Sequence, residues 1–175
     1  INERENLEVL IPEITKTFFP VVDDLEIIIV DDASTDGTLE FVESYPEDGI
    51  SLRIISRKER LGIGSALIEG YNNCNGDVII SSDADLSFSV DDMLVLFELI
   101  NSGSDMVIGV RHKRGSTYTA KKLPTKIKKF VSTIGNRIIA MRTGVKISDF
   151  TANFRAMKKT TWDKIETDES SNPIL

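Results

Sequence analysis

The sequence predicts an α/β fold in which helices flank a mostly parallel sheet. Apolar runs rich in β-branched residues alternate with segments whose apolar residues repeat at helical spacing, which is typical of parallel strands joined by helices. The length of 175 residues suits one domain with its own core. A hydrophobic content of 41% and a charged content of 28% are near the globular average and exclude a disordered or fibrous chain.

Four strands are expected, and the loops that follow them should gather at one edge of the sheet. Ligands of such sheets bind beyond the carboxyl ends of the strands, so a functional site is expected in these loops. The expected strands cover residues 26–30, 52–56, 77–82 and 105–110. Helices are expected at residues 4–18, 36–45, 63–74 and 91–102.

The pattern is incomplete at both ends. Residues 1–6 read as a loop that enters a helix, although a sheet of this kind calls for a strand in front of it. Residues 166–175 are polar until the last few and show no periodicity. We therefore expect residues 1–175 to form a single, partial domain that lacks its first strand and its C-terminal part.

Charge is divided unevenly along the chain, although the net charge is −7. Residues 111–164 carry 15 lysines and arginines against 2 aspartates and glutamates, whereas the rest of the chain carries 6 and 26. A basic segment in an acidic protein favours a local anionic partner over nucleic acid, for which a basic domain would be expected. The alternative is a solvated helix surface.

A helix is expected to begin near Pro124 and to end near Gly144. Its apolar residues share one stripe, and its lysines and arginines occupy the other faces. Such a helix could lie on an anionic membrane surface, but packing of its stripe on the sheet is equally open. We treat residues 111–146 as a basic segment that faces the acceptor or the membrane. The stripe consists of Ile127, Phe130, Val131, Ile134, Ile138 and Met141.

The hydropathy of the sequence and its content of only one cysteine and one histidine exclude several classes of protein. No apolar run approaches the roughly 20 residues that cross a bilayer. One cysteine, Cys74, and one histidine, His112, exclude a disulfide framework and a zinc site built from these residue types. The cysteine usage favours a reducing compartment. Phe154 and Trp162 are expected to anchor the core.

Two carboxylates separated by one residue follow the strand expected at 77–82. Asp83 and Asp85 can reach one Mg²⁺ or Mn²⁺ that also binds a diphosphate. A solvated turn or a helix cap is the plainer interpretation of the same spacing.

A second acidic pair, Asp31-Asp32, ends the strand expected at 26–30. Four carboxylates should then converge at one sheet edge, where a cation would offset their repulsion. The alternative is turn chemistry, which we prefer for Asp36 because it precedes a helix.

Glycines open the helix expected at 63–74. Gly62 and Gly64 permit close approach to the backbone, where free amides favour a phosphate or a sugar hydroxyl. Three cations directly precede them and favour the same ligands: Arg57, Lys58 and Arg60.

Together these motifs resemble glycosyltransferase family 2, the inverting enzymes of GT-A (Rossmann-like) fold, and within it the dolichyl-phosphate mannose synthases and related polyprenyl-phosphate sugar transferases. The resemblance runs over nearly all of residues 1–162, with the motifs in the family's order. They are Asn2-Glu3-x-x-Asn6-Leu7, Val30-Asp31-Asp32-Ala33-Ser34-x-Asp36-Gly37-Thr38, Leu61-Gly62-x-Gly64-x-Ala66, Gly76-Asp77, Asp83-Ala84-Asp85-Leu86-Ser87 and Asp149-Phe150-Thr151-Ala152-Asn153-Phe154-Arg155. In the last of these, Ala152-Asn153 replaces the family's usual Ser-Gly, and in the basic segment a lysine stands where an arginine is often found.

The resemblance implies a nucleotide-sugar donor, with GDP-mannose favoured over a UDP-sugar. The donor would contact Glu3, Asp31, Asp32, Asp83, Ala84 and Asp85. Its diphosphate would be bound through Mg²⁺ or Mn²⁺ on Asp83 and Asp85, with Ser87 at a position that supplies a further ligand in some relatives.

The resemblance also implies a polyprenyl or dolichyl phosphate as acceptor, and hence a place at the cytoplasmic face of a membrane. The residues implied for acceptor binding are Arg111, Lys128, Ser132, Asp149 and Arg155, and the catalytic set is Asp83, Asp85 and Arg111. A phosphate acceptor is largely ionised near neutrality and needs no general base. A saccharide hydroxyl would need one, for which Asp149 is the candidate.

Two other classes of function stay open at this point. A receiver-like signalling module also places paired acids around Mg²⁺ beside a strand, although it would leave Asp83-Ala84-Asp85 and the basic helix unexplained. A domain that binds nucleotide without turnover is the other alternative.

Overall fold

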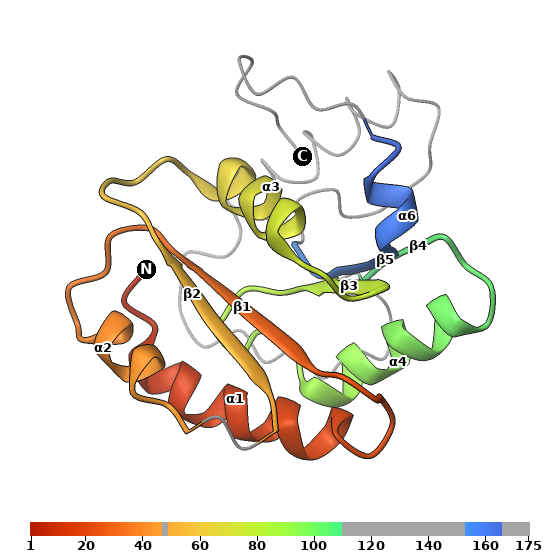
Figure 1. Cartoon of the computed structure of the whole chain (residues 1–175), viewed down its shortest axis with the longest axis horizontal. Coiled ribbons are helices and arrows are strands. Elements are labelled where there is room, and N and C mark those ends of the chain that lie inside the picture. The colour runs from red at the N-terminus through yellow and green to blue at the C-terminus, as the bar shows by residue number, and fades with distance from the viewer. Residues whose placement is uncertain (47–48, 110–152, 166–175) are drawn as a thin grey trace, which may run out of the picture.

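The computed structural model of the chain describes residues 1–46, 49–109 and 153–165. Over these residues, helices cover both faces of the strands (Figure 1). Helices α1 (Arg4–Phe18), α2 (Thr38–Glu43) and α4 (Val90–Asn101) lie on one side, with α3 (Ile63–Asn73) and the short α6 (Lys159–Trp162) on the other. The strands are β1 (Glu26–Asp31), β2 (Ser51–Ser56), β3 (Val78–Ser81), β4 (Met106–Ile108) and β5 (Arg155–Lys158).

Hydrogen bonding divides the described strands into one parallel and one antiparallel sheet. β1 pairs in parallel with β2, from Glu26 opposite Ser51 to Asp31 opposite Ser56. β5 runs between β3 and β4 and is antiparallel to both. The expectation of a mostly parallel sheet therefore holds only for part of the described chain, because a strand from the far end of the sequence is inserted next to β3.

β5 was not among the expected strands, and its composition explains why. Its sequence, Arg155-Ala156-Met157-Lys158, has charged ends and no β-branched residue, so neither propensity nor alternation indicates a strand. Its two middle residues are nevertheless 0% and 2% exposed, because both faces of this strand are covered by helices. Tertiary burial, rather than local preference, makes this segment a strand.

The four strands and four helices expected before residue 111 agree with the structure to within two residues at each end. The start of α4 shows why such boundaries are readable. Ser89 accepts a hydrogen bond from the Asp92 amide at 3.1 Å, and the Asp92 carboxylate accepts one from the Ser89 amide at 3.2 Å. This reciprocal capping satisfies two amides that the helix leaves without partners.

The core has a layer on each side of β3 and β5. Ala156 and Phe154 face α1 and α4, whereas Met157 faces α3 and α6, as the two-residue period of a strand requires. Phe154 is 3% exposed and Trp162 is 5% exposed, which confirms both as core anchors. A third cluster packs α1 and α2 against β1 through Leu7, Ile11, Ile27, Val42 and Ile50.

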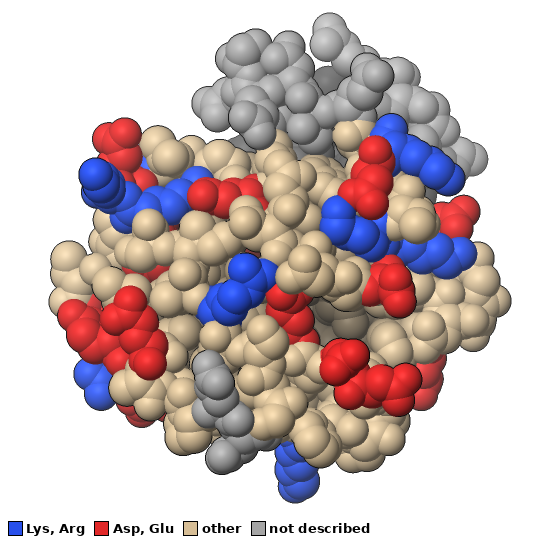
Figure 2. Space-filling view, in the orientation of Figure 1, with Lys and Arg blue, Asp and Glu red and all other residues tan. Residues whose placement is uncertain are grey.

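The lengths of the helices and the distribution of surface charge bear on how the protein could interact with a membrane. Among the described residues, no helix combines the length and the apolar character needed to span a bilayer. On the face drawn in Figure 2, acidic and basic side chains of these residues are interspersed. The helix expected after Pro124, and with it the whole basic segment 111–146, lies outside the described residues.

Candidate active site at the ends of β1 and β3

The turn after β1 is organised by the first of the paired aspartates. Asp31 is 4% exposed, and its carboxylate accepts hydrogen bonds from the amide of Ser34, at 2.9 Å, and from the Ser34 hydroxyl. Ala33 between them has a φ of 61°, which only a tightly held turn imposes on an alanine. Asp31 therefore shapes the turn from within.

The start of the chain closes over this turn. The amide of Asn2 donates to the Ser34 hydroxyl at 2.7 Å, and the Asn2 side chain accepts from the Thr35 amide at 2.9 Å. The Arg4 amide donates to the Asp36 carboxylate at 3.1 Å. These bonds link the beginning of α1 to a loop more than 30 residues away and make one rigid unit of the two.

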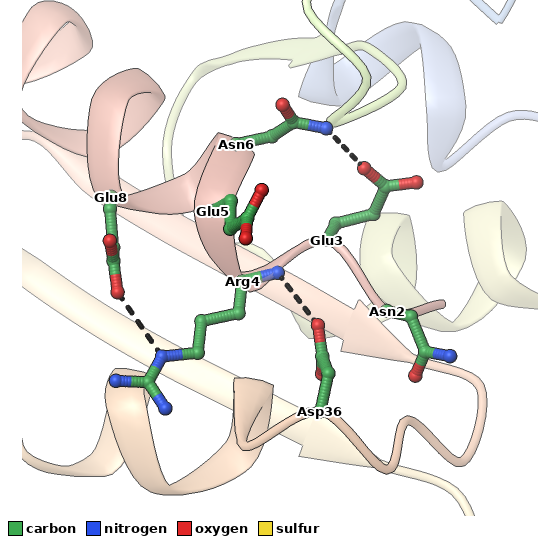
Figure 3. A pocket seen from close by; sticks show the side chains of 7 residues that line it. All are labelled: Asn2, Glu3, Arg4, Glu5, Asn6, Glu8 and Asp36. Atoms are coloured by element: carbon green, nitrogen blue, oxygen red, sulfur yellow. Dashed lines mark hydrogen bonds and ion pairs between the residues drawn. The ribbon is translucent and has the colours of Figure 1, made fainter.

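A cavity of about 520 Å³ opens beside this unit, between the start of α1 and Asp36 (Figure 3). Glu3 lines it, and one oxygen of its carboxylate accepts a hydrogen bond from the Asn6 side chain at 2.5 Å. Arg4 instead binds Glu8 at 3.1 Å along α1. The remaining lining residues are Asn2 and Glu5. The cavity is therefore lined entirely by polar side chains, which can form hydrogen bonds with the hydroxyl groups or nitrogen atoms of a ligand.

Asp36 behaves as the turn residue that we expected. Its carboxylate accepts hydrogen bonds from the amide of Thr38, at 3.1 Å, and from the Thr38 hydroxyl at 2.5 Å. The hydroxyl bond is the main reason why the pKa of Asp36 lies below its usual value. Asp36 thus stabilises the first turn of α2, where a negative charge also complements the helix dipole.

Asp32, the second aspartate of this pair, is bound to a buried arginine. Its carboxylate forms an ion pair with Arg57, whose side chain is 5% exposed, and accepts a hydrogen bond from the Gly62 amide at 3.2 Å. Arg57 also donates to the Ser65 hydroxyl at 2.7 Å and to the Gly62 carbonyl at 3.1 Å, and lies 3.7 Å from Glu69. Arg57 was one of three cations expected to favour a phosphate or a sugar hydroxyl; instead it points inward and fastens the turn before α3 to β1.

The rest of that turn faces solvent. Lys58 and Arg60 are exposed, as a role in binding an anion would require. Gly62 has a φ of 92°, a conformation that favours glycine, and a Cβ at this position would meet no atom within 4 Å. The space beside this glycine is therefore open to a ligand.

Asp83 and Asp85 follow β3 and have surroundings of a different kind. Asp83 is half-buried, and one of its oxygens accepts a hydrogen bond from the side-chain amide of Asn153 at 3.0 Å. Asp85 is exposed and accepts one from the Ser87 amide at 2.9 Å, across Leu86 with its φ of 57°. Within the described part of the chain, no cationic side chain pairs with either aspartate.

The four aspartates do not form one ligand cluster. Among residues 1–46, 49–109 and 153–165, no group of three or more carboxylates, cysteines or histidines is arranged to hold a metal ion. The four carboxylates expected at one sheet edge therefore do not act as one metal-holding group, and two of them, Asp31 and Asp32, are engaged by Ser34 and Arg57. Two carboxylates, Asp83 and Asp85, keep oxygens that no described cation neutralises.

Asn153 is a site residue that the sequence marked only as a departure from a motif. It is 9% exposed, and its carbonyl accepts a hydrogen bond from the Ser81 hydroxyl at 2.9 Å. Ser81 in turn lies 2.7 Å from the hydroxyl of Tyr71, whose pKa burial raises, so that the phenol stays protonated. This chain of contacts ties α3, β3 and the start of β5 to Asp83.

The remaining predicted residues fall into two groups. Ala84 is partly buried and packs against both hydrophobic clusters that contain residues of α1. Its side chain therefore anchors the turn between the two carboxylates. Arg155 is 7% exposed in β5, opposite Ser81. The other acceptor residues predicted from the sequence lie outside the described residues: Arg111, Lys128, Ser132 and Asp149.

Known proteins resemble this chain in sequence and in fold. The family model described as Glycosyl transferase family 2 matches residues 1–165. Dolichol-phosphate mannosyltransferase of Pyrococcus furiosus is 33% identical over 178 aligned positions, and the match covers 99% of this chain and 47% of that protein. Undecaprenyl-phosphate 4-deoxy-4-formamido-L-arabinose transferase of Pseudomonas fluorescens is 29% identical over 163 residues, which is 93% of this chain and 46% of that protein. The chain thus spans about half the length of these curated relatives.

The fold also resembles that of a solved structure. Glucosyl-3-phosphoglycerate synthase from Mycobacterium tuberculosis, crystallised with uridine diphosphate, superimposes with a TM-score of 0.59 at 21% identity. The match covers 89% of this chain and 54% of that one. This likeness confirms the α/β fold.

Proposed function

The chain belongs to glycosyl transferase family 2, and from this premise we propose that it transfers a sugar from a nucleotide-sugar donor to a polyprenyl phosphate. Two relatives, a dolichol-phosphate mannosyltransferase and an undecaprenyl-phosphate sugar transferase, support this acceptor class. The observation that carries the proposal is the state of Asp83 and Asp85, two carboxylates that meet only neutral hydrogen-bond donors among the described residues.

The donor is a nucleoside diphosphate sugar, with GDP-mannose favoured over a UDP-sugar. Its base and ribose bind between Glu3 and the turn that Asp31 and Asp32 hold in shape. The polar cavity beside Glu3 and the open space beside Gly62 support this placement. The nucleotide then runs from the end of β1 toward the end of β3.

The residues at the end of β3 fit a divalent cation. Asp83 and Asp85 offer hard oxygen ligands, which Mg²⁺ and Mn²⁺ prefer, and one or two carboxylates with substrate phosphates are the usual way of holding Mg²⁺. Ser87, whose amide already binds Asp85, is the candidate for a further ligand. When bound, the cation would neutralise charge on the leaving diphosphate.

The reaction is a displacement with inversion at the anomeric carbon. An oxygen of the acceptor phosphate forms the new bond as the bond to the nucleoside diphosphate breaks. Because the acceptor is already ionised, the protein needs no general base and has to hold two anionic groups in line. Arg111, Lys128, Ser132 and Arg155 are proposed to bind the acceptor phosphate, and the basic segment 111–146 to meet anionic head groups at the cytoplasmic face of a membrane.

A donor and acceptor panel tests this function directly. GDP-mannose, UDP-glucose and UDP-N-acetylglucosamine are incubated with a polyprenyl phosphate in detergent and Mn²⁺, and the lipid product is extracted and counted. The proposal predicts sugar in the lipid fraction with one donor and none when the phosphate is replaced by the free polyprenol. Transfer to a saccharide but not to the lipid phosphate would contradict it and would favour Asp149 as a base.

A further inference from the structure

The structure assigns a role to Asn153 that the family resemblance does not supply. We propose that Asn153 is a positioning residue, which orients the Asp83 carboxylate for a divalent cation by donating a hydrogen bond to one of its oxygens. The proposal rests on the proposed function, because it takes Asp83 to be a metal ligand. Residue 153 departs from the family motif that this segment resembles. An asparagine stands where the motif has glycine, which has no side-chain donor.

The contact itself is direct and bridges distant parts of the chain. The side-chain amide nitrogen of Asn153 lies 3.0 Å from Oδ1 of Asp83, although 70 residues separate them in sequence. Asn153 is 9% exposed, so little water competes for this bond. A hydrogen bond to a charged group is stronger than one between neutral groups, so this bond restricts rotation of the carboxylate.

The backbone of Asn153 is held in place from two sides. Its carbonyl accepts the Ser81 hydroxyl at 2.9 Å, on the β3 side. On the β4 side, the Gly109 amide donates to the carbonyl of the next residue, Phe154, at 2.9 Å. The ring of Phe154 stacks on Phe88 with centroids 4.0 Å apart and leaves no room for a side chain at position 109, where a Cβ would lie 2.1 Å from it. The amide of Asn153 is therefore presented by a rigid support.

The chemistry of an amide suits this position better than that of a cation. Asp32 shows the alternative: its partner is Arg57, which cancels its charge. A neutral donor fixes the orientation of a carboxylate and leaves its negative charge for a metal ion. Groups that hydrogen-bond to metal ligands commonly contribute 10- to 100-fold to metal affinity. Asn153 fits that description for Asp83.

The test compares variants by their affinity for Mn²⁺, measured from the electron paramagnetic resonance signal of free Mn²⁺ with GDP or UDP present. Asn153→Ala removes the donor, and Asn153→Leu removes it while keeping the volume, so that loss of packing is controlled. Both are expected to bind Mn²⁺ about tenfold more weakly. In turnover they should show a raised KM for Mn²⁺ and a kcat that recovers at saturating Mn²⁺.

Tyr71→Phe is the matched control, because it removes the hydroxyl next to Ser81 but leaves the Asn153–Asp83 bond in place. It should lower the melting temperature and leave the affinity for Mn²⁺ unchanged. Wild-type affinity in both Asn153 variants would overturn the proposal, as would an equal loss of affinity in Tyr71→Phe. Asp83→Asn separates the two levels: if it abolishes Mn²⁺ binding while both Asn153 variants keep the wild-type affinity, only the role of Asn153 fails. If Asp83→Asn also binds Mn²⁺ normally, both claims fail.

Discussion

The acidic pairs that end β1 and β3 look alike in sequence but have different partners in the folded protein. Asp31 and Asp32 are engaged by a serine hydroxyl, backbone amides and a buried arginine, so the fold itself uses their charge. Asp83 and Asp85 receive only neutral donors from the described residues. Position at a strand end therefore does not decide the role of a carboxylate. Carboxylates whose charge is paired within the fold shape a turn, whereas carboxylates with only neutral donors stay available for a ligand.

The largest effect that this comparison predicts is a loss of turnover without a loss of fold. Replacing Asp83 and Asp85 together by asparagine should lower kcat on the order of 10²–10³-fold, because charge on the leaving diphosphate is no longer stabilised. The melting temperature should stay close to that of the wild type, since no described cation depends on these carboxylates. Counting labelled lipid product and recording a thermal melt check both halves. A double variant that keeps wild-type turnover would break the comparison.

The opposite behaviour is expected when the partner of Asp32 is removed. Arg57→Met should lower the free energy of unfolding by about 3 kcal/mol, because it leaves a largely buried carboxylate without its cation. Arg53→Met is the matched control, since Arg53 is 43% exposed in its ion pair with Glu26 and should contribute less than about 1 kcal/mol. Urea unfolding measures both. Equal losses would show that the Asp32–Arg57 pair is not a special feature of the fold.

A smaller effect separates the turn from the rest of the fold. Gly37 has a φ of 85°, so Gly37→Ala should lower the free energy of unfolding by about 1 kcal/mol and disturb Arg4, whose guanidinium lies 2.8 Å from the added Cβ. Gly103 has a φ of 113° and no atom within 4 Å of an added Cβ. Gly103→Ala should therefore lower the free energy of unfolding by a similar amount. Only Gly37→Ala should weaken nucleotide binding by calorimetry. If Gly103→Ala weakened nucleotide binding as much as Gly37→Ala does, the turn after β1 would not be part of the nucleotide site.

The smallest predicted effect is a pH dependence at Asp36. Folding lowers the pKa of Asp36 below its usual value of 3.8, so its contribution is fully present above that value and is lost as pH falls through the folded pKa. The wild type should therefore be more resistant to urea than Asp36→Asn at pH 6, and this difference should disappear toward pH 2. A difference that is independent of pH would show that the charge of Asp36 has no part in holding α2.

Much of this architecture could be predicted from the sequence because its signals are local. The β-branched run before Asp31 and the capping residues Ser89 and Asp92 fix a strand and a helix start without help from distant residues. The order of the motifs was enough to identify glycosyl transferase family 2, which the family match over residues 1–165 confirms. The α/β class was confirmed by the structure and by its likeness to a solved structure.

What could not be predicted depends on contacts across long sequence separations. β5 is a strand only because helices bury both of its faces, and neither Ala156 nor Met157 is a residue type that indicates a strand. The inward direction of Arg57 follows from its meeting Asp32 across the parallel pair, where a basic loop alone suggested a phosphate. Asn153 became part of the site through an antiparallel pairing that brings it next to Asp83.

The most direct test of the central claim is the effect of Mn²⁺ on nucleoside diphosphate binding, measured by calorimetry with GDP and UDP. We predict that Mn²⁺ raises the affinity of the wild-type protein for one of them about tenfold or more, and has no effect on the Asp83→Asn, Asp85→Asn double variant. An equal rise in the double variant would contradict the assignment of these two carboxylates to the cation that holds the donor.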